Sequence, residues 1–478
     1  MSDSTAQGLG IRDIHRAYKE KQMSVRDLVM RCLSRIAETD SPPGGLNAVL
    51  EINPDALFIA DALDERLKRN ENPSLLFGIP VLLKDNINTA DKMHTSAGSL
   101  ALSEHYAAKD ASIVKRLRAA GAVILGKANM TEFANYMSDQ GMPCGYSSRG
   151  GQVLNPHNHD ESPGGSSSGS AAALAAGLCP LSVGTETSGS IMYPAWRNGI
   201  VGIKPTLGLV GRSGIIPISY TLDIAGPMAN TVYDAAALLS VMAGFDADDP
   251  STHGMNTEQE VVDYTQCLFS ESLEGVRIGI NPAHMDEGAR SREEDEAFDS
   301  LCGLLEDAGA LLIKDVAMEK LTVDMTIMKY EFKSAMNYYL AGSGGRTAMN
   351  TLQDIILYNQ THAERTLRFG QGLFLDANNK ASGCLSEGEY VSAMKAREDA
   401  IKKLDKLFDD NKLDVMLCGA FSNIAPATGF PSITVPVGKE KNNVPIGSYW
   451  IARRYDEGRL LRAAHCAEKL ISGASYKN

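Results

Sequence analysis

Two turns rich in glycine and serine are the segments of this sequence most suited to chemistry. The first, 164–170, opens directly into the small-residue segment 171–177, and the second spans 184–191. A flexible linker would be flanked by polar sequence, whereas these turns are followed by apolar segments. Glycines at the start of a helix let backbone N–H groups converge on an anion. The pattern therefore predicts a site for a phosphate or for an oxyanion formed during a reaction.

The phosphate alternative lacks its usual motifs. Neither a Gly-Lys-Ser/Thr P-loop nor a G-x-G-x-x-G turn after a strand is present. This leaves serine chemistry, for which one hypothesis is the G-x-S-x-G pattern of 165–169, with Ser167 as the nucleophile of an α/β-hydrolase. Such an enzyme needs a downstream histidine, and the candidates are His253, His284, His362 and His465.

Other patterns are weaker. Ser112–Lys115 and Ser392–Lys395 match S-x-x-K, but the companion Lys-Thr-Gly and Ser-Asp-Asn motifs are missing, so both indicate a helix surface. His157, His159 and Asp160 lie in a polar loop with no further ligand at a spacing typical of metal sites. We therefore expect no metal at this loop.

A third arrangement combines the serines of the two turns with a lysine at the end of a strand. Lys84 follows the apolar run 76–83, and Lys127 within 126–128 is an equally plausible strand-end lysine. Further motifs accompany this arrangement. They are Gly78–Asp85, Gly126–Glu132, Pro163–Ala173, Gly184–Ile191, Gly202–Thr206, Asp223 with Gly226-Pro227, and Gly429–Pro436.

Together these motifs resemble the amidase signature family over nearly the whole chain. Within that family, Thr185–Ser190, the turn Phe369–Gln371 and the helix around Tyr330–Phe332 are most similar to the peptide amidase branch. The resemblance implies an α/β fold, an α/β/α sandwich around a large twisted mixed β-sheet. It also implies activity without a cofactor or a metal.

The resemblance assigns the chemistry residue by residue. Ser190 matches the nucleophile, Ser166 the bridging serine that the family holds in a cis peptide bond, and Lys84 the base. A lysine can accept a proton at neutral pH only if burial lowers its pKa, and a strand end in the core would supply that burial. Ser166 would relay the proton and return it to the departing nitrogen, because an unprotonated amine leaves badly.

Two further sets of residues follow from the same resemblance. Backbone N–H groups would form the oxyanion hole, where each donor contributes roughly 3 to 4 kcal/mol. Three residues of a substrate-side loop would face the acyl group. These sets are Thr187, Ser188, Gly189 and Ser190 for the oxyanion hole, and Tyr136, Met137 and Ser138 for the substrate.

The sequence also departs from the family pattern. Glu186, Ser188 and Met192 replace the common Asp, Gly and Arg, so a carboxylate-to-Arg pair is expected to be absent or rebuilt. The Ser188 side chain would narrow or hydrate the pocket beside the oxyanion hole. Gly419-Ala420 replaces the usual Pro-Thr after Leu413-Asp414, so the family pattern does not predict the conformation of this loop.

Composition limits the partners and the compartment. The formal charge of −13 argues against nucleic acid as a partner. The first twenty residues carry charges throughout, and no stretch reaches the roughly 18 apolar residues of a membrane span, so we expect a cytoplasmic protein with no membrane partner. The eight cysteines are spread singly, which is typical of buried thiols in a reducing compartment.

The elements expected to position these residues alternate between helix and strand, as in α/β proteins. A capping box at Ser24 and Asp27 predicts a helix, and Asp110 is expected to cap the helix 112–120. We expect one domain, 1–478, with a helical N-terminal region, 1–60, and a mostly helical substrate-side insertion, 320–400. The other expected elements are strands at 76–83, 122–126, 273–280 and 432–437, and helices at 171–177, 292–308, 322–340 and 460–470.

The sequence thus predicts an amidase that cleaves a carboxylic amide through a seryl acyl-enzyme. The peptide amidase likeness favours a primary amide, such as a peptide C-terminal or acylated amino-acid amide, and a monomer or homodimer. One alternative is the amidase-like subunit of a glutamine-dependent amidotransferase, which would need partner subunits. Another is a non-catalytic binding protein on the same fold, for which Ser188 is the motivating change.

Overall fold

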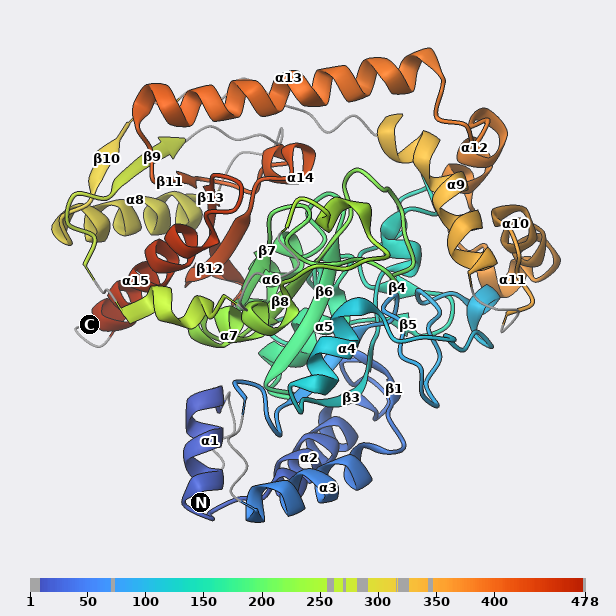
Figure 1. Cartoon of the computed structure of the whole chain (residues 1–478), viewed down its shortest axis with the longest axis horizontal. Helices are drawn as coiled ribbons and strands as arrows, with labels where there is room; N and C mark the ends of the chain where they lie inside the picture. Colours follow the sequence, from blue (N-terminus) through green and yellow to red (C-terminus); the bar gives the residue numbers. More distant parts are fainter. Residues whose placement is uncertain are drawn as a thin grey trace.

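The structure, a computed structural model, describes residues 9–69, 74–255, 262–269, 272–281, 291–314, 316, 326–342 and 347–475. Within these ranges eleven strands form one mixed sheet (Figure 1). In spatial order the strands are β1 (Val49–Ile52), β3 (Val123–Ala128), β2 (Pro80–Lys84), β6 (Leu181–Glu186), β8 (Ile224–Ala229), β7 (Val201–Lys204), β12 (Ser432–Lys439), β13 (Pro445–Ala452), β11 (Val415–Cys418), β9 (Arg277–Asn281) and β10 (Leu311–Ile313).

Helices surround this sheet, so the predicted α/β fold with a large mixed sheet is confirmed. Helices α4, α7 and α15 pack in sequence against one another, and α5 packs beside α6. The helices are α1 (Ile11–Lys19), α2 (Val25–Arg35), α3 (Ala56–Lys68), α4 (Ser112–Ala119), α5 (Ser168–Ala175), α6 (Met192–Asn198), α7 (Val232–Met242), α8 (Arg292–Asp307), α9 (Thr326–Ala341), α10 (Leu352–Thr361), α11 (Ala363–Thr366), α12 (Gly372–Lys380), α13 (Gly388–Asn411), α14 (Ile424–Thr428) and α15 (Glu457–Ser475).

Strand directions bring two chain segments to one edge of the sheet. β2 runs parallel to both of its neighbours, β3 and β6, and Leu83 pairs with Val183. The carboxyl ends of β2 and β6 therefore lie side by side. In α/β sheets such an edge is where ligands bind.

The helix that follows the first glycine-serine turn approaches the backbone closely. A Cβ atom on Gly169 would lie 2.3 Å from the Ala48 carbonyl oxygen and 2.4 Å from that of Asn129. The Gly169 N–H donates to the Asn129 carbonyl at 2.9 Å. The small residues of α5 thus allow tight packing against this backbone.

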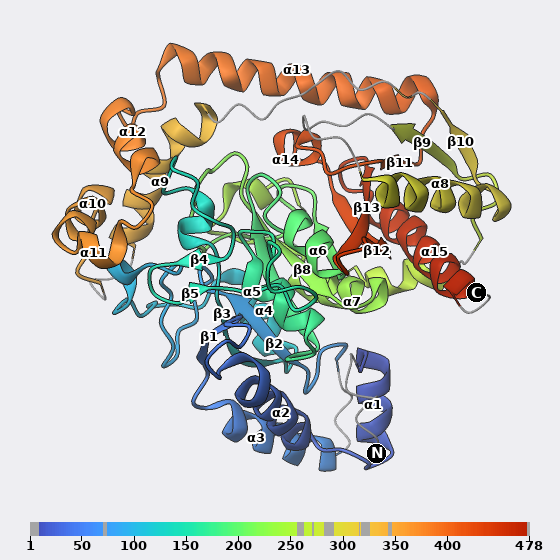
Figure 2. The same ribbon diagram turned by 180° about the vertical axis from the view of Figure 1, so that it is seen from behind.

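Two apolar clusters form the core. The larger surrounds the sheet, and the smaller lies between helices α9, α10 and α12 of the expected insertion and the loops near residues 97–102, 130–142 and 216–222. Helix α13 runs along one side of the molecule and leads from α12 back to β11, as both views show (Figures 1 and 2). Helices α1, α2 and α3 gather on the opposite side.

Local details differ from the sequence predictions, for example at Leu76, Leu273 and Asp110. The run from Leu76 is a turn until β2 begins at Pro80, and Leu273–Val276 is a turn before β9. Asp110 does not cap α4. Its carboxylate instead accepts the Ala90 N–H and pairs with Arg118, because a loop contact is available there.

Other predicted elements are present. The capping box at Ser24 and Asp27 is confirmed, with Ser24 as the N-cap of α2. The predicted helix 322–340 is α9, although residues 322–325 lie outside the described part of the chain. No helix in the described ranges is long and apolar enough to cross a membrane.

Candidate active site

Lys84 ends β2 with its side chain completely enclosed by the protein. Its Nζ donates to Ser166 Oγ at 2.7 Å and to the Thr185 carbonyl oxygen at 3.0 Å. Burial lowers the pKa of Lys84 to about 7, against the opposing effect of the Glu186 and Asp223 carboxylates. A lysine in this state can exist as a free amine near neutral pH and can take a proton.

Lys127, the other strand-end lysine, is equally buried but has different partners. Its Nζ donates to the Ile87 carbonyl at 2.6 Å and to Thr95 Oγ1 at 2.8 Å. Burial lowers the pKa of Lys127 to about 8, with Asp85 acting in the opposite direction. The structure therefore joins Lys84, and not Lys127, to the glycine-serine turns.

Ser166 lies where the first turn enters α5. The peptide bond between Gly165 and Ser166 is cis, and the Ser166 carbonyl accepts the Thr131 N–H at 3.1 Å. The neighbouring Ser167 does not fit the α/β-hydrolase hypothesis. It is fully buried, and its hydroxyl donates to the Thr185 carbonyl at 3.1 Å.

Ser190 lies in the second turn, between β6 and α6. Its carbonyl accepts the Ser167 N–H at 3.1 Å, so backbone contacts hold the two turns together. Ser190 is 9% exposed, whereas Ser166 and Lys84 are 0% exposed. Of the three predicted residues, Ser190 is thus nearest to solvent, whereas Ser166 and Lys84 are both enclosed by the protein.

The turn 187–190 is held by side chains on several sides. Glu186 Oε2 accepts the N–H groups of Ile191 at 2.8 Å and Met192 at 3.0 Å, and the carboxylate also attracts the Gly189 N–H. Backbone groups, with nearby Lys204, thus replace the carboxylate-to-Arg pair of the family pattern. Because Gly189 has a φ of +94°, it reverses the chain at this point.

Ser188, the other departure in this turn, faces the loop after β11. Its hydroxyl donates to Asn423 Oδ1 at 3.3 Å. The ring of Phe421 lies over Gly189, where a Cβ atom would be 2.5 Å from Phe421 Cζ. The loop after β11, whose conformation the sequence did not predict, therefore packs on the turn. The Tyr449 hydroxyl also donates to the Ser422 carbonyl of this loop at 3.0 Å.

The three residues expected to face the acyl group lie against the insertion. Tyr136 and Met137 are buried in the smaller apolar cluster, where the Tyr136 ring lies 5.0 Å from that of Phe332. The Ser138 hydroxyl donates to the Phe369 carbonyl. These residues connect the loop after β3 to α9 and to the chain before α12.

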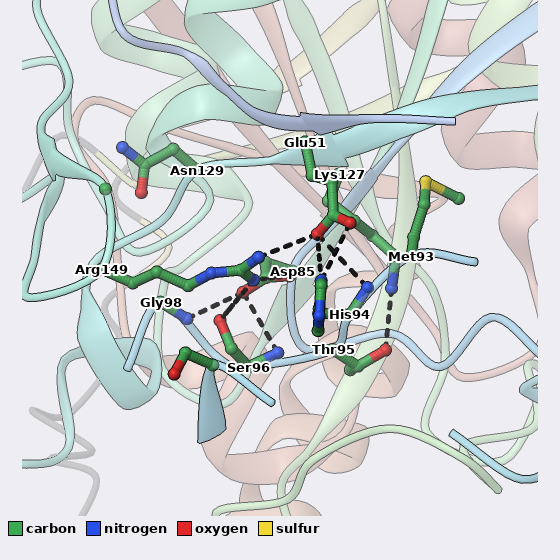
Figure 3. A network of polar contacts seen from close by, with 12 residues as sticks. Glu51, Asp85, Met93, His94, Thr95, Ser96, Gly98, Lys127, Asn129 and Arg149 are labelled. Atoms are coloured by element: carbon green, nitrogen blue, oxygen red, sulfur yellow. Dashed lines mark hydrogen bonds and ion pairs between the residues drawn. The ribbon is translucent and has the colours of Figure 1, made fainter. Parts of the chain in front are cut away.

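A polar network around Asp85, the residue after Lys84, was not predicted from the sequence (Figure 3). Asp85 accepts the Gly98 N–H at 2.9 Å and the Ser96 hydroxyl. Arg149 donates to Glu51 at 2.8 Å and lies 3.7 Å from Asp85. The one sequence signal for this network was that Asp85 directly follows Lys84. In the structure, Asp85 anchors the chain at that point.

The sequence analysis noted Asp223 as part of a motif but gave it no role in the site. Asp223 Oδ1 accepts the Thr187 hydroxyl at 2.6 Å, and Oδ2 accepts the N–H groups of Ile218 at 2.7 Å and Ser219 at 2.9 Å. Asp223 thus connects the loop before β8 to the start of the turn 187–190. Its position ahead of Gly226-Pro227 was the only signal in the sequence.

The remaining sequence hypotheses have ordinary structural explanations. Ser112 and Lys115 lie on α4, and the Ser392 hydroxyl on α13 donates to the Gly388 carbonyl. His157 Nε2 pairs with the Asn198 carbonyl at 2.9 Å. In the part of the chain that the structure describes, no three His, Cys, Asp or Glu residues are placed to hold a metal.

The histidines required by the α/β-hydrolase hypothesis lie elsewhere in the structure. His465 lies 3.3 Å from Glu468 on α15, and His362 pairs with the Tyr358 carbonyl. His253 is exposed beside Ala247. His284 lies outside the described residues.

Comparisons with known proteins agree with this geometry. A family model described as Amidase matches residues 27–429. A probable amidase of Arabidopsis thaliana is 37% identical over 473 residues, which cover 96% of this chain and 89% of the plant protein. A glutamyl-tRNA(Gln) amidotransferase subunit of Alkaliphilus metalliredigens is 33% identical, with 96% of each chain covered.

Solved structures give the same result. The X-ray structure of native peptide amidase from Stenotrophomonas maltophilia superposes with a TM-score of 0.88, at 37% identity over 97% of both chains. An amidase family protein of Bacillus anthracis gives a TM-score of 0.90 at 36% identity, over 97% of this chain and 90% of that one. The chain therefore belongs to the amidase signature family, and it is an amidase that hydrolyses carbon–nitrogen bonds of carboxylic amides.

Proposed function

We propose that Ser190, Ser166 and Lys84 carry out the hydrolysis and that the substrate is a primary amide. One observation carries the assignment of these three residues. A fully buried lysine, with a pKa of about 7, donates a 2.7 Å hydrogen bond to a serine of the first glycine-serine turn. The second turn, with Ser190, is joined to that serine's neighbour by the backbone.

In the acylation step Ser190 Oγ forms a bond to the amide carbonyl carbon. Its proton passes to Ser166 Oγ while the proton of Ser166 passes to the free amine of Lys84. The carbonyl oxygen becomes an oxyanion. The backbone N–H groups of Thr187, Ser188, Gly189 and Ser190 are the proposed donors to it, since they belong to the turn that carries Ser190.

The same route then runs in reverse. Lys84 returns its proton through Ser166 to the amide nitrogen, the carbon–nitrogen bond breaks, and ammonia leaves. Water attacks the acyl-enzyme, and its proton takes the same path to Lys84. Collapse of the second tetrahedral intermediate releases the carboxylic acid and restores the Ser190 hydroxyl.

The proposed substrate class is a peptide C-terminal amide or an acylated amino-acid amide. The 37% identity to a peptide amidase over 97% of both chains supports this choice. We further propose that residues 320–400 form the substrate side, with Tyr136, Met137 and Ser138 at the acyl group. Contacts from Tyr136 and Ser138 to Phe332 and Phe369 in this insertion support that placement.

A fluorophosphonate probe followed by peptide mapping tests the nucleophile. We expect phosphonylation at Ser190 alone and none in Ser190→Ala. Ammonia release from a series of N-acetylated amino-acid amides then tests the substrate class. Labelling of Ser167, or unchanged ammonia release in Ser190→Ala, would contradict the proposal.

Lys127 offers a matched control for the base, since it is as buried as Lys84 and lies next to the last residue of the adjacent strand. Lys84→Met is expected to slow labelling at least about a thousandfold, because Ser190 then has no proton acceptor. Lys127→Met is expected to stay within about threefold of the wild type in labelling rate per folded molecule. Equal losses in both variants would contradict the assignment of Lys84.

Ester and amide substrates separate the two roles of Lys84. An ester leaving group needs less protonation than an amine. Lys84→Ala is therefore expected to lose more activity on an amide than on the matching ester. Equal losses on both substrates would contradict the proposed proton route.

The 33% identity to the amidotransferase protein supports a second candidate, a subunit that releases ammonia from glutamine. In that case the isolated chain would hydrolyse glutamine only with its partner subunits present. Amide hydrolysis by the purified chain, running as a monomer or homodimer in gel filtration, would exclude this candidate. The same result would exclude a non-catalytic binding protein.

A further inference from the structure

Two reciprocal tyrosine–glutamate hydrogen bonds join α9 to α13. The Tyr390 hydroxyl on α13 donates to Glu331 Oε1 on α9 at 2.8 Å. In the other direction, the Tyr330 hydroxyl on α9 donates to Glu389 Oε2 on α13 at 2.8 Å. The two bonds are chemically alike and join the same pair of helices.

The two glutamates differ in exposure and in their other hydrogen-bond partners. Glu389 is exposed, whereas Glu331 is 1% exposed. The Glu331 carboxylate accepts three further hydrogen bonds, from the Ser219 hydroxyl, the Thr221 hydroxyl and the Thr221 N–H at 3.0 Å. Its two oxygens therefore receive four donors, three of them from the loop 218–223.

That loop carries the carboxylate that reaches the turn of Ser190. Asp223 accepts the Ser219 and Ile218 N–H groups, which curls the loop around it, and accepts the Thr187 hydroxyl at 2.6 Å. Arg212 secures the other side of the loop, donating to the Tyr220 carbonyl at 2.6 Å and pairing with Asp249. The loop is therefore held by Glu331 of α9, by Arg212 and by Thr187.

We propose that Glu331 is a positioning residue for the turn 187–190, acting through the loop 218–223 and the Asp223–Thr187 hydrogen bond. This inference rests on the proposed function, since it concerns the alignment of the proposed oxyanion donors. It gives the helical insertion a second task besides contact with substrate. Only a carboxylate accepts four donors at this place, because a glutamine side chain would turn an N–H₂ group toward at least one of them.

The experiment measures the rate of Ser190 phosphonylation at saturating probe, and separately the probe concentration for half-maximal rate. In both measurements the labelling signal is scaled to the fraction of molecules that finally become labelled. Loss of oxyanion alignment slows the bond-forming step, so Glu331→Gln is expected to lower the maximal rate about tenfold. The half-saturating concentration should stay within about twofold, a split that partial unfolding would not produce.

Glu389→Gln is the matched control, since it loses the equivalent tyrosine bond between the same helices. Its maximal rate is expected within about twofold of the wild type. A tenfold loss in both variants would assign the effect to the helix pair and would overturn the inference. A normal rate in Glu331→Gln would overturn it as well.

A double-mutant cycle tests the route through Thr187. Thr187→Val removes the hydroxyl but keeps the backbone N–H, and it should slow the maximal rate by a similar factor. Adding Glu331→Gln to Thr187→Val should then change the rate by less than about twofold, because both act through one contact. Losses that multiply would overturn the route.

Ser219→Ala keeps the inference testable if Glu331→Gln fails to fold. It removes one of the four donors and is expected to lower the maximal rate about threefold, whereas an unchanged rate would overturn the inference. Failure of the proposed function would look different. The wild-type chain itself would then show no labelling of Ser190.

Discussion

At the scale of single residues, three buried lysines show that burial lowers the pKa of each, whereas position decides which of them contacts a serine. Burial lowers the pKa of Lys84 to about 7, and the pKa of both Lys127 and Lys204 to about 8. Of the three, Lys84 is the one that donates to Ser166. Lys204 donates to the Pro205 carbonyl and faces Glu186 and Glu457.

The pKa of Lys84 predicts the pH dependence of acylation. Only the free amine accepts the proton, so the rate should rise about tenfold per pH unit below pH 7 and level off above it. Labelling rates of Ser190 between pH 5 and 9 measure this profile. A rate that is flat or falls between pH 6 and 7.5 would contradict Lys84 as the base.

Asp223 should shift that profile. Its carboxylate opposes the effect of burial and raises the pKa of Lys84, so Asp223→Asn is expected to move the midpoint to lower pH. Glu389→Gln, in the first turn of α13, serves as the control and should leave the midpoint in place. A midpoint that moves upward in Asp223→Asn would refute the electrostatic argument.

At the scale of elements, the site depends on how closely α5 and the two turns approach their neighbours. Gly169 lies against the backbone of residues 48 and 129, and Gly189 lies under the Phe421 ring. Both contacts exclude a side chain. The same small residues that make these segments look like a linker therefore allow Ser166 and Ser190 to come together.

Gly169→Ala should accordingly destabilise the protein. The added methyl meets carbonyl oxygens that cannot move independently, so we expect a loss of about 3 kcal/mol in the free energy of unfolding. Gly303→Ala in α8 is the control, because nothing lies within 4 Å of its Cβ position. Alanine there should stabilise the helix by about 0.5 to 1 kcal/mol. Urea unfolding of both variants checks the opposite signs.

At the scale of the whole molecule, the insertion carries an apolar cluster of its own. Residues of α9, α10 and α12 pack with the loops after β2 and β3, separately from the large cluster around the sheet. Helix α13 returns the chain along the side of the molecule to β11 (Figures 1 and 2). The packing of these helices can thus vary without disturbing the sheet that holds Lys84.

This arrangement predicts uneven stability. The central strands β2, β6 and β8 are buried along their whole lengths, whereas α10 to α12 expose many of their residues. Amides of α10 and α12 should therefore exchange with solvent through smaller openings, and faster, than those of the three strands. Hydrogen exchange read by mass spectrometry tests this, and equal protection in both regions would show that the insertion unfolds only with the sheet.

The sequence reached much of the fold because several signals are local. The capping box at Ser24, the small-residue helix after the first turn and the strand after Gly429 depend on neighbouring residues alone. Asp110 misled because the same carboxylate can cap a helix or accept a loop N–H, and a partner at Ala90 decides between them. Strand starts were misplaced where apolar residues line a turn, as at Leu76.

The contacts across long distances in the chain could not be predicted. Glu331 meets Thr221, and Asp223 meets Thr187, because loops and helices converge in space without any pattern that marks the pairs. The network of Asp85, Arg149 and Glu51 has the same character. Such pairings depend on packing, which no local window of sequence contains.

The sequence by itself determined the family, the α/β fold and the short set of residues able to do serine chemistry. The tertiary structure decided which strand-end lysine is joined to them. In the parallel pairing of β2 with β3, Lys127 lies opposite Leu83 and Ala128 opposite Lys84. Because successive side chains of a strand point to opposite faces, this register sends Lys127 to one face of the sheet and Lys84 to the other, where Ser166 receives it.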